Sequence, residues 1–222
     1  MRGQAVGVQL LDAMKSKNSQ NAIIIFQKNL VPGKVKTRLA ATVGNHQAME
    51  IYRELVAFTH KQATEVTDAD VWIFFSDDFE EIGQNFQKYI TAKMVQDGGD
   101  LGERMKNAFQ TIFGLGYQTA ILIGTDCPEI SPKIMETAFN SLKNQDVVIG
   151  PALDGGYYLV GMKTVHFQLF EHIPWSTENV LPLTLEKLNQ NNLSYILLPG
   201  LSDIDTEEDW LNFKKLISET YE

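Results

Sequence analysis

The sequence predicts a single soluble α/β domain, built on a mostly parallel β-sheet that helices cover on both faces. Short apolar segments rich in β-branched residues alternate with segments of helical periodicity from residue 22 almost to the end, a pattern typical of such sheets. Of the 222 residues, 44% are hydrophobic, which is enough to form a full core. No linker or internal repeat divides the chain, so residues 21–222 are interpreted as one domain and residues 1–20 as an N-terminal extension without chemistry.

The predicted strands are short apolar runs of the kind found in buried parallel sheets. They lie at Ala22–Phe26, Val71–Phe75, Ala120–Ile123, Val147–Ile149 and Tyr195–Leu198. Between them, apolar residues recur on one helical face, which indicates core packing. These stripes span Tyr52–Val66, Phe79–Phe86, Leu101–Ile112, Met135–Leu142 and Leu181–Leu188. Two helix starts are also predicted: Ser131 caps a helix that begins at Pro132, and Thr206 caps the last helix.

Composition excludes several classes of protein. The net charge of −9 argues against nucleic-acid binding through a basic surface. No run of about 18 apolar residues predicts a membrane span. The lone cysteine, Cys127, excludes an internal disulfide and suits a cytoplasmic location. The four histidines lack metal-ligand spacing, and His46 and His60 are expected to face solvent on one helix. An acidic protein that binds a polyanion then needs a local basic cluster, a metal ion, or both.

Ligands of such sheets bind beyond the carboxyl ends of the strands, so the loops there are the first candidates. The loop after the first strand has four cations in eleven residues, Lys28, Lys34, Lys36 and Arg38. With Pro32 and Gly33 it suits an anion such as a phosphate, although a solvated basic turn is the simpler alternative. The loop is not a P-loop, and the chain has no GxGxxG motif.

A second candidate is the segment from Gln96 to Met105. Three glycines within five residues, 98–102, permit close backbone approach to a ligand, and the helix that begins near Leu101 offers free amides. A tight turn between strand and helix would explain the same glycines.

Acidic residues follow two predicted strands. Asp126 comes directly after the strand at Ala120–Ile123, where a carboxylate is costly unless a cation balances it. Asp203 and Asp205 follow the last strand, and their alternation places both on one side of an extended segment. Carboxylates from two loops suit a Mg²⁺ or Mn²⁺ ion shared with phosphates. The alternatives are structural: Asp126 would cap the turn at Pro128, and Asp203 or Asp205 would cap the last helix.

The segment Asp154-Gly155-Gly156 lies between two short strands and is either a hairpin turn or a pocket wall beside a polar, ring-shaped acceptor. Trp175 lies among hydroxyl residues and is either a core residue or a platform for the acceptor.

Six ordered motifs carry a family resemblance that covers about residues 22–210. They are GKVKTRL, DLGERM, IGTDCPEI, GPALDGGYYLVGM, IPWST and DIDTEED. Together they resemble a bacterial family of glycosyltransferase-A-like proteins associated with radical-SAM enzymes or arsenosugar biosynthesis. The resemblance implies the nucleotide-diphospho-sugar transferase fold, a Rossmann-like three-layer sandwich. The chain is also similar, more distantly, to molybdenum-cofactor and phospholactate guanylyltransferases.

The resemblance also implies roles for individual residues. Phosphates would contact Lys34, Lys36 and Arg38, and the nucleotide pocket would include Gln96, Gly99 and Asp100. Mg²⁺ or Mn²⁺ would bind Asp126 and either Asp205 or Asp203. The acceptor would lie beside Asp154, Gly155, Gly156 and Trp175.

Two departures from the family patterns leave the reaction open. Pro32-Gly33-Lys34 replaces a glycine-rich signature, and Thr125-Asp126 supplies one acid where many glycosyltransferases have an Asp-x-Asp. The first hypothesis is a glycosyltransferase that uses a nucleotide-diphospho-sugar, with Asp126, Asp205 and Asp154 as catalytic residues. The second is a nucleotidyltransferase that couples a nucleoside triphosphate to a phosphorylated acceptor and releases pyrophosphate. The third is a non-catalytic nucleotide-binding protein. The nucleobase, sugar, acceptor and oligomeric state stay open.

Overall fold

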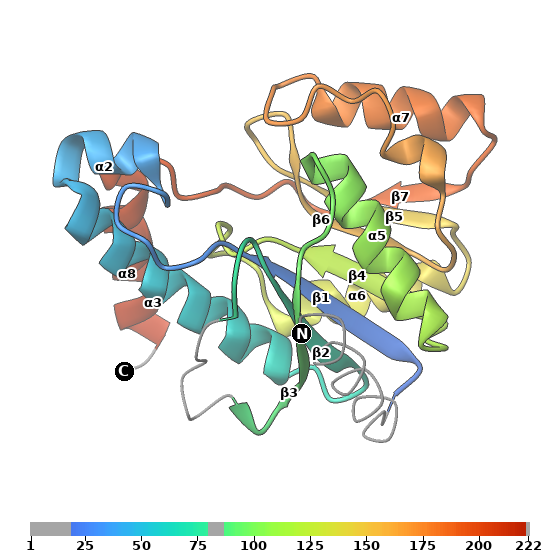
Figure 1. Ribbon diagram of the computed structural model, residues 1–222, viewed down its shortest axis with the longest axis horizontal. Coiled ribbons are helices and arrows are strands. Elements are labelled where there is room, and N and C mark those ends of the chain that lie inside the picture. The colour runs from blue at the N-terminus through green and yellow to red at the C-terminus, as the bar shows by residue number, and fades with distance from the viewer. Residues whose placement is uncertain (1–18, 80–86, 221–222) are drawn as a thin grey trace.

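The computed structural model describes residues 19–79 and 87–220, with the backbone alone for residues 216–220. Its centre is a seven-stranded sheet with the order β3-β2-β1-β4-β6-β5-β7 (Figure 1). The strands are β1 (Asn21–Gln27), β2 (Asp70–Phe75), β3 (Ile90–Val95), β4 (Thr119–Ile123), β5 (Val147–Pro151), β6 (Tyr157–Met162) and β7 (Tyr195–Leu197). All neighbouring pairs are parallel except the two that β6 makes with β4 and β5. The predicted mostly parallel sheet is therefore confirmed.

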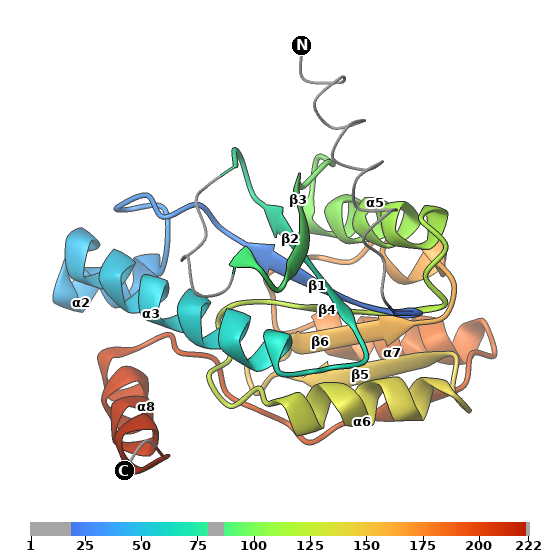
Figure 2. The same cartoon turned by 90° about the horizontal axis from the view of Figure 1, so that it is seen from below.

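Helices cover both faces of the sheet, which gives three layers (Figure 2). The helices are α2 (Thr37–Val43), α3 (Asn45–Thr64), α5 (Leu101–Gly114), α6 (Pro132–Leu142), η1 (Phe167–Leu169), α7 (Val180–Gln190) and α8 (Glu207–Thr220). Apolar residues of α3 and α6 pack on one face of the sheet, where Ile23 and Ile25 of β1 point. Those of α5, η1 and α7 pack on the opposite face, where Ile24 points. The alternation along β1 thus feeds two cores, as expected for a strand buried on both sides.

A third apolar cluster joins α2 and α3 to the last segment of the chain. It contains Leu39 of α2, Leu55 of α3, and Ile204, Trp210 and Phe213 from the last segment, all of them buried. Figures 1 and 2 both show α8 beside α2 and α3. This packing brings the segment with Asp203 and Asp205 against the loop that follows β1.

The predicted helix starts are confirmed. The hydroxyl of Ser131 accepts a hydrogen bond from the Ile134 amide, and Pro132 is the first residue of α6. At α8, the Asp209 amide donates to the Thr206 hydroxyl at 3.2 Å, and the Thr206 amide donates to the Asp209 carboxylate at 2.8 Å. This reciprocal cap fixes where the segment with Asp203 and Asp205 ends and α8 begins.

Three features differ from the prediction or lie beyond its test. Strand β3 was not predicted, because only Met94 of its six residues is buried and the apolar run is interrupted. Phe79 is 43% exposed, and the rest of the helix expected at 79–86 lies outside the described residues. Residues 1–18 of the expected N-terminal extension also lie outside them. Among the described helices, none is long and apolar enough to cross a membrane.

Candidate functional site

A cleft with a volume of about 1170 Å³ lies at the carboxyl ends of the strands. The chain turns toward β2 after β1 and toward β5 and β6 after β4, and β1 and β4 are neighbours. Ligands of open α/β sheets bind where the strand order reverses in this way. Every site residue predicted from the sequence except Gly155 lines this cleft: Lys34, Lys36, Arg38, Gln96, Gly99, Asp100, Asp126, Asp154, Gly156, Trp175, Asp203 and Asp205. Their roles there stay predictions.

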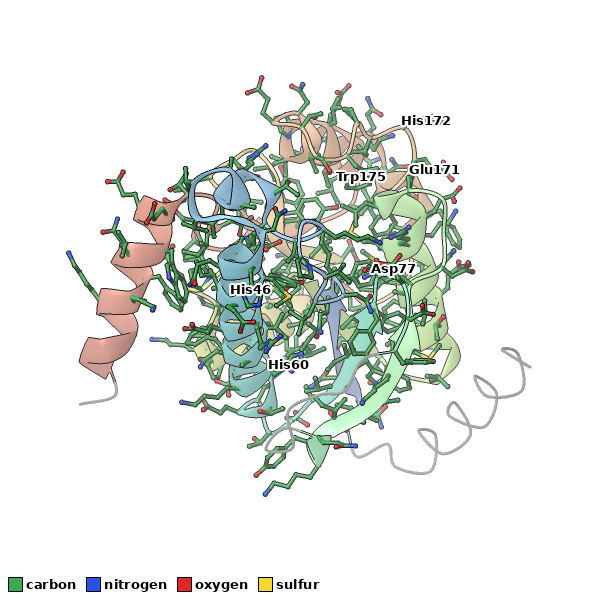
Figure 3. The ribbon with its side chains drawn as sticks, turned by 60° about the vertical axis from the view of Figure 1, so that its left-hand side comes forward. His46, His60, Asp77, Glu171, His172 and Trp175 are labelled. Atoms are coloured by element: carbon green, nitrogen blue, oxygen red, sulfur yellow. The ribbon has the colours of Figure 1, made fainter. Side chains whose placement is uncertain are left out.

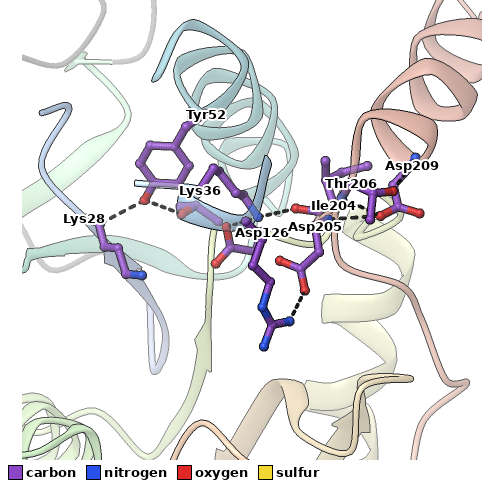
Figure 4. A network of polar contacts seen from close by, with 10 residues as sticks. Lys28, Lys36, Tyr52, Asp126, Ile204, Asp205, Thr206 and Asp209 are labelled. Atoms are coloured by element: carbon purple, nitrogen blue, oxygen red, sulfur yellow. Dashed lines mark hydrogen bonds and ion pairs between the residues drawn. The ribbon is translucent and has the colours of Figure 1, made fainter. Parts of the chain in front are cut away.

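Lys36 is held between two loops (Figure 4). Its ammonium lies 2.5 Å from a carboxylate oxygen of Asp126 and donates to the carbonyl oxygen of Ile204 at 2.6 Å. Its side chain is only 5% exposed, and its backbone is left-handed with a φ of 47°. A non-glycine residue keeps that conformation only where its surroundings impose it. The residue predicted to contact phosphate therefore also neutralises the predicted metal ligand.

Arg38 makes the second contact between the basic loop and the acidic segment. Its guanidinium lies 3.0 Å from Asp205, with 76% of the Arg38 side chain and 37% of the Asp205 side chain exposed. An ion pair this exposed contributes little to stability. Arg38 can therefore turn to an anionic ligand at little cost, which the buried Lys36 cannot do.

Carboxylates converge at this end of the cleft. Burial, and then the nearby charge of Asp126, raise the pKa of Asp203 to about 7, with further contributions from Asp154 and Asp205 against an opposing one from Lys36. A bound divalent cation would relieve this repulsion, so the donor set suits a hard metal ion. In the part of the chain that the structure describes, no three His, Cys, Asp or Glu side chains form a ready metal site.

Tyr52, which the sequence placed on a core-facing helix stripe, reaches the strand ends. It is buried, and its hydroxyl accepts a hydrogen bond from the Lys28 amide at 2.9 Å and lies 2.7 Å from the Thr125 hydroxyl. All three residues line the cleft, and Figure 4 shows Tyr52 beside Lys28. In the contact between the two hydroxyls, either oxygen can be the donor. The phenol thus fixes the ends of β1 and β4 relative to each other, directly beside Asp126.

Two amides at the turn into α5 are bonded within the protein. The Gly99 amide donates to the carboxylate of Glu103 at 2.8 Å, and the Glu103 amide donates to Asp100 at 2.8 Å. Gly98 has a φ of 142°, and a Cβ there would lie 2.7 Å from the Arg104 nitrogen. Gly98 is therefore required by the tight turn, and the Gly99 and Glu103 amides are not free for a ligand.

The Asp154 segment combines both of the readings given for it. It is the turn of the hairpin between β5 and β6, and an Asp154 oxygen accepts from the Gly156 amide at 2.9 Å. It is also a wall of the cleft. Gly155 instead faces the segment before α7: a Cβ on it would lie 2.4 Å from the Glu178 carbonyl oxygen, and its own oxygen accepts from the Leu181 amide at 2.9 Å. Gly155 therefore supports the wall from behind.

Trp175 is half-buried and lines the cleft. Its ring meets that of Tyr157 edge to face, with centroids 6.4 Å apart. A Cβ on Gly102 would lie 2.4 Å from the indole nitrogen, so the absence of a side chain there lets α5 approach the indole. By contrast, Trp72 and Trp210 are core residues.

His60 does not face solvent, so that prediction is wrong. Figure 3 shows His46 and His60 on the same helix, but only His46 is exposed. Ring nitrogen Nε2 of His60 lies 2.9 Å from the Gln27 side-chain oxygen. Burial, and then the charge of Lys93, lower the pKa of His60 to about 4. A neutral histidine therefore holds Gln27, a residue that lines the cleft.

The family model described as "Uncharacterized protein conserved in bacteria (DUF2064)" matches residues 59–177, more than half of the chain. No curated protein matches this chain significantly. Among solved structures, a "putative nucleotide-diphospho-sugar transferase" from Desulfovibrio desulfuricans G20 is similar, with 36% identity and a TM-score of 0.77. The match covers 85% of this chain and 84% of that one.

More distant structures share the fold. The 4-diphosphocytidyl-2C-methyl-D-erythritolsynthase of Anaerococcus prevotii DSM 20548 has 10% identity and a TM-score of 0.61, with 93% of this chain and 98% of that one covered. A CMP:2-keto-3-deoxy-manno-octonic acid synthetase complexed with CTP has 13% identity and a TM-score of 0.56, with 91% and 100% covered. The fold predicted from the six motifs is confirmed. The chain belongs to the DUF2064 family, within the nucleotide-diphospho-sugar transferase superfamily.

Proposed function

We propose that this chain is a glycosyltransferase that uses a nucleotide-diphospho-sugar and Mg²⁺ or Mn²⁺. The coarser assignment, a transferase of this superfamily, rests on the similar structures. The observation that carries the finer assignment is the cleft, in which the loop after β1 and three aspartates lie beside the β5–β6 hairpin and the loop with Trp175. The first half suits a diphosphate and the second suits an acceptor. The buried, unpaired Cys127 suits a reducing compartment such as the cytoplasm.

The donor half would hold the diphosphate through exposed cations. Lys34 and Arg38 both line the cleft and can reach phosphate oxygens. Asp126, with Asp205 or Asp203, would hold the metal ion, which when bound neutralises charge on the leaving diphosphate. Lys36 lies against Asp126 and adds a fixed positive charge beside that position.

In the transfer step, an acceptor hydroxyl oxygen attacks the anomeric carbon of the donor sugar. The bond from that carbon to the diphosphate breaks, and the nucleoside diphosphate leaves with the electron pair. The hydroxyl proton goes to a base, for which Asp154 is the candidate because it lines the cleft on the hairpin. The Gly156 amide donates to one oxygen of Asp154 and holds the carboxylate in the turn.

Nucleotidyl transfer is the competing function, and one panel separates the two. Purified protein is incubated with nucleotide-sugars or with nucleoside triphosphates, each with Mg²⁺ or Mn²⁺. Consumption of a nucleotide-sugar with release of a nucleoside diphosphate supports the proposal, whereas pyrophosphate release from a triphosphate supports the alternative. If neither nucleotide class raises the melting temperature with metal present, both enzymatic readings fail.

The metal role is tested with Asp126→Asn. A nucleotide at 100 times its dissociation constant stabilises the folded protein by about 2.7 kcal/mol. The variant should lose the metal-dependent part of this stabilisation while its circular dichroism spectrum stays that of the wild type. Glu136→Gln, on an exposed position of α6 outside the cleft, is the control and should keep it. Unchanged metal-dependent binding in Asp126→Asn would remove this residue from the site.

A further inference from the structure

Charge is distributed unequally along the cleft. Its lining cations come from the loop after β1 and from the start of α5: Lys28, Lys34, Lys36, Arg38 and Arg104. The end of the cleft formed by the β5–β6 hairpin and by residues 175–180 lies against the start of α5 at Gly102. Its lining residues include Asp154 and Glu178 but, within the described chain, no lysine or arginine.

The two carboxylates of this end belong to segments that touch. Residue 155 packs so closely on the Glu178 backbone that a Cβ there would lie 2.4 Å from the Glu178 carbonyl oxygen. Both Asp154 and Glu178 line the cleft. The two carboxylates of this end therefore lie on one wall.

The same end offers an aromatic surface and hydroxyl groups. Trp175 and Tyr157 line it with their rings edge to face, and Ser176 and Thr177 follow Trp175 in the lining. Aromatic rings pack against apolar faces of a ligand, while carboxylates accept hydrogen bonds from its hydroxyls. Neither group neutralises an anion.

We propose that the acceptor of this enzyme is a hydroxyl compound without a phosphate group, bound between the β5–β6 hairpin and Trp175. This rests on the proposed glycosyltransferase function and deepens it. A phosphorylated acceptor would bring a dianion beside Asp154 and Glu178 with no cation from this wall to balance it, which is unfavourable. The inference thus also separates sugar transfer from nucleotidyl transfer to a phosphorylated acceptor.

The first test measures the local charge without any substrate. Trp175 is the partly exposed tryptophan, since Trp72 is 0% and Trp210 4% exposed. Its fluorescence, isolated by subtracting a Trp175→Phe variant, should be quenched more strongly by caesium than by iodide, by about twofold or more, because the local field is negative. The Asp154→Asn, Glu178→Gln double variant should lose this preference. Equal or stronger quenching by iodide in the wild type would overturn the proposal.

The second test compares matched acceptors. Monosaccharides and their 6-phosphates are supplied with the nucleotide-sugar that the protein binds, in the presence of Mg²⁺, and nucleoside diphosphate release is measured. The unphosphorylated member should be used at least about tenfold faster, with a smaller ratio in Glu178→Gln and an unchanged ratio in Glu186→Gln, a control on the exposed side of α7. Faster use of the phosphate ester overturns the proposal. Failure to bind or consume any nucleotide-sugar would refute the proposed function instead. The quenching experiment needs no substrate, so it would still test the negative charge beside Trp175.

Discussion

The ammonium of Lys36 and the carboxylate of Asp126 form an ion pair of 2.5 Å that joins the loop after β1 to the loop after β4. Lys36 also donates to the Ile204 carbonyl, and the Ile204 amide donates to the Asp126 carbonyl at 3.0 Å. Three segments far apart in sequence are thereby tied at one point. The left-handed backbone of Lys36 is the local strain that this arrangement imposes.

Replacing Lys36 with methionine should destabilise the protein by about 1–2 kcal/mol, because Asp126 and the Ile204 carbonyl lose a charged donor. Lys34→Met, on an exposed position of the same loop, should change stability by less than about 0.5 kcal/mol. Urea denaturation of the two variants checks this. Similar stability of both would mean that the Lys36 contacts contribute nothing to the fold.

Tyr52→Phe should leave the Lys28 amide and the Thr125 hydroxyl without their partner, at a cost of about 1–3 kcal/mol. It should also weaken nucleotide binding, because the ends of β1 and β4 beside Asp126 are no longer fixed. The control is Tyr89→Phe, since Tyr89 is 52% exposed. Thermal denaturation and nucleotide titration measure the two effects, and a phenylalanine variant with wild-type values in both would contradict this role.

His60 should make the protein less stable in mild acid. Its pKa is lowered to about 4 in the folded protein, against 6.5 as the ordinary value, because it is buried. The unfolded chain therefore takes up a proton first as the pH falls. The contribution of His60 to the free energy of unfolding is therefore fully present above about pH 6.5. It is lost as the pH falls toward 4, by up to about 1.4 kcal/mol per pH unit.

His60→Gln should flatten this dependence, since an amide does not titrate and can still contact Gln27. His46→Gln, on the exposed side of α3, should keep the wild-type slope. Free energies of unfolding from urea titrations at pH 7, 6, 5 and 4 give the comparison. Parallel curves for wild type and His60→Gln would show that His60 does not cause the loss.

The sequence predicts the fold and the neighbourhood of the site for a physical reason. Buried parallel strands such as β1 and β4 are continuous apolar runs, and the residues after them, including Lys36 and Asp126, must meet at one edge of the sheet. Tyr52 could not be predicted as part of the site, because helical periodicity reports that its side chain is buried but not which polar group its hydroxyl reaches. The burial of His60 could not be predicted either, because a single histidine on a helix does not show that its ring will contact the Gln27 side chain.

Gly155→Ala should be the more damaging of two glycine substitutions with similar backbones. Gly155 has a φ of 92° and Gly44 a φ of 83°, so alanine is strained at both. A Cβ at Gly155 would also lie 2.4 Å from the Glu178 carbonyl oxygen, whereas nothing lies within 4 Å of one at Gly44. We expect Gly44→Ala to cost about 1 kcal/mol and Gly155→Ala about 2–4 kcal/mol, measured by urea denaturation. The larger loss should come with weaker acceptor use, because the overlap pushes the Asp154 turn away from the Glu178 segment. Equal losses would mean that the hairpin and the segment before α7 yield without strain, and that this wall of the cleft is not rigidly held.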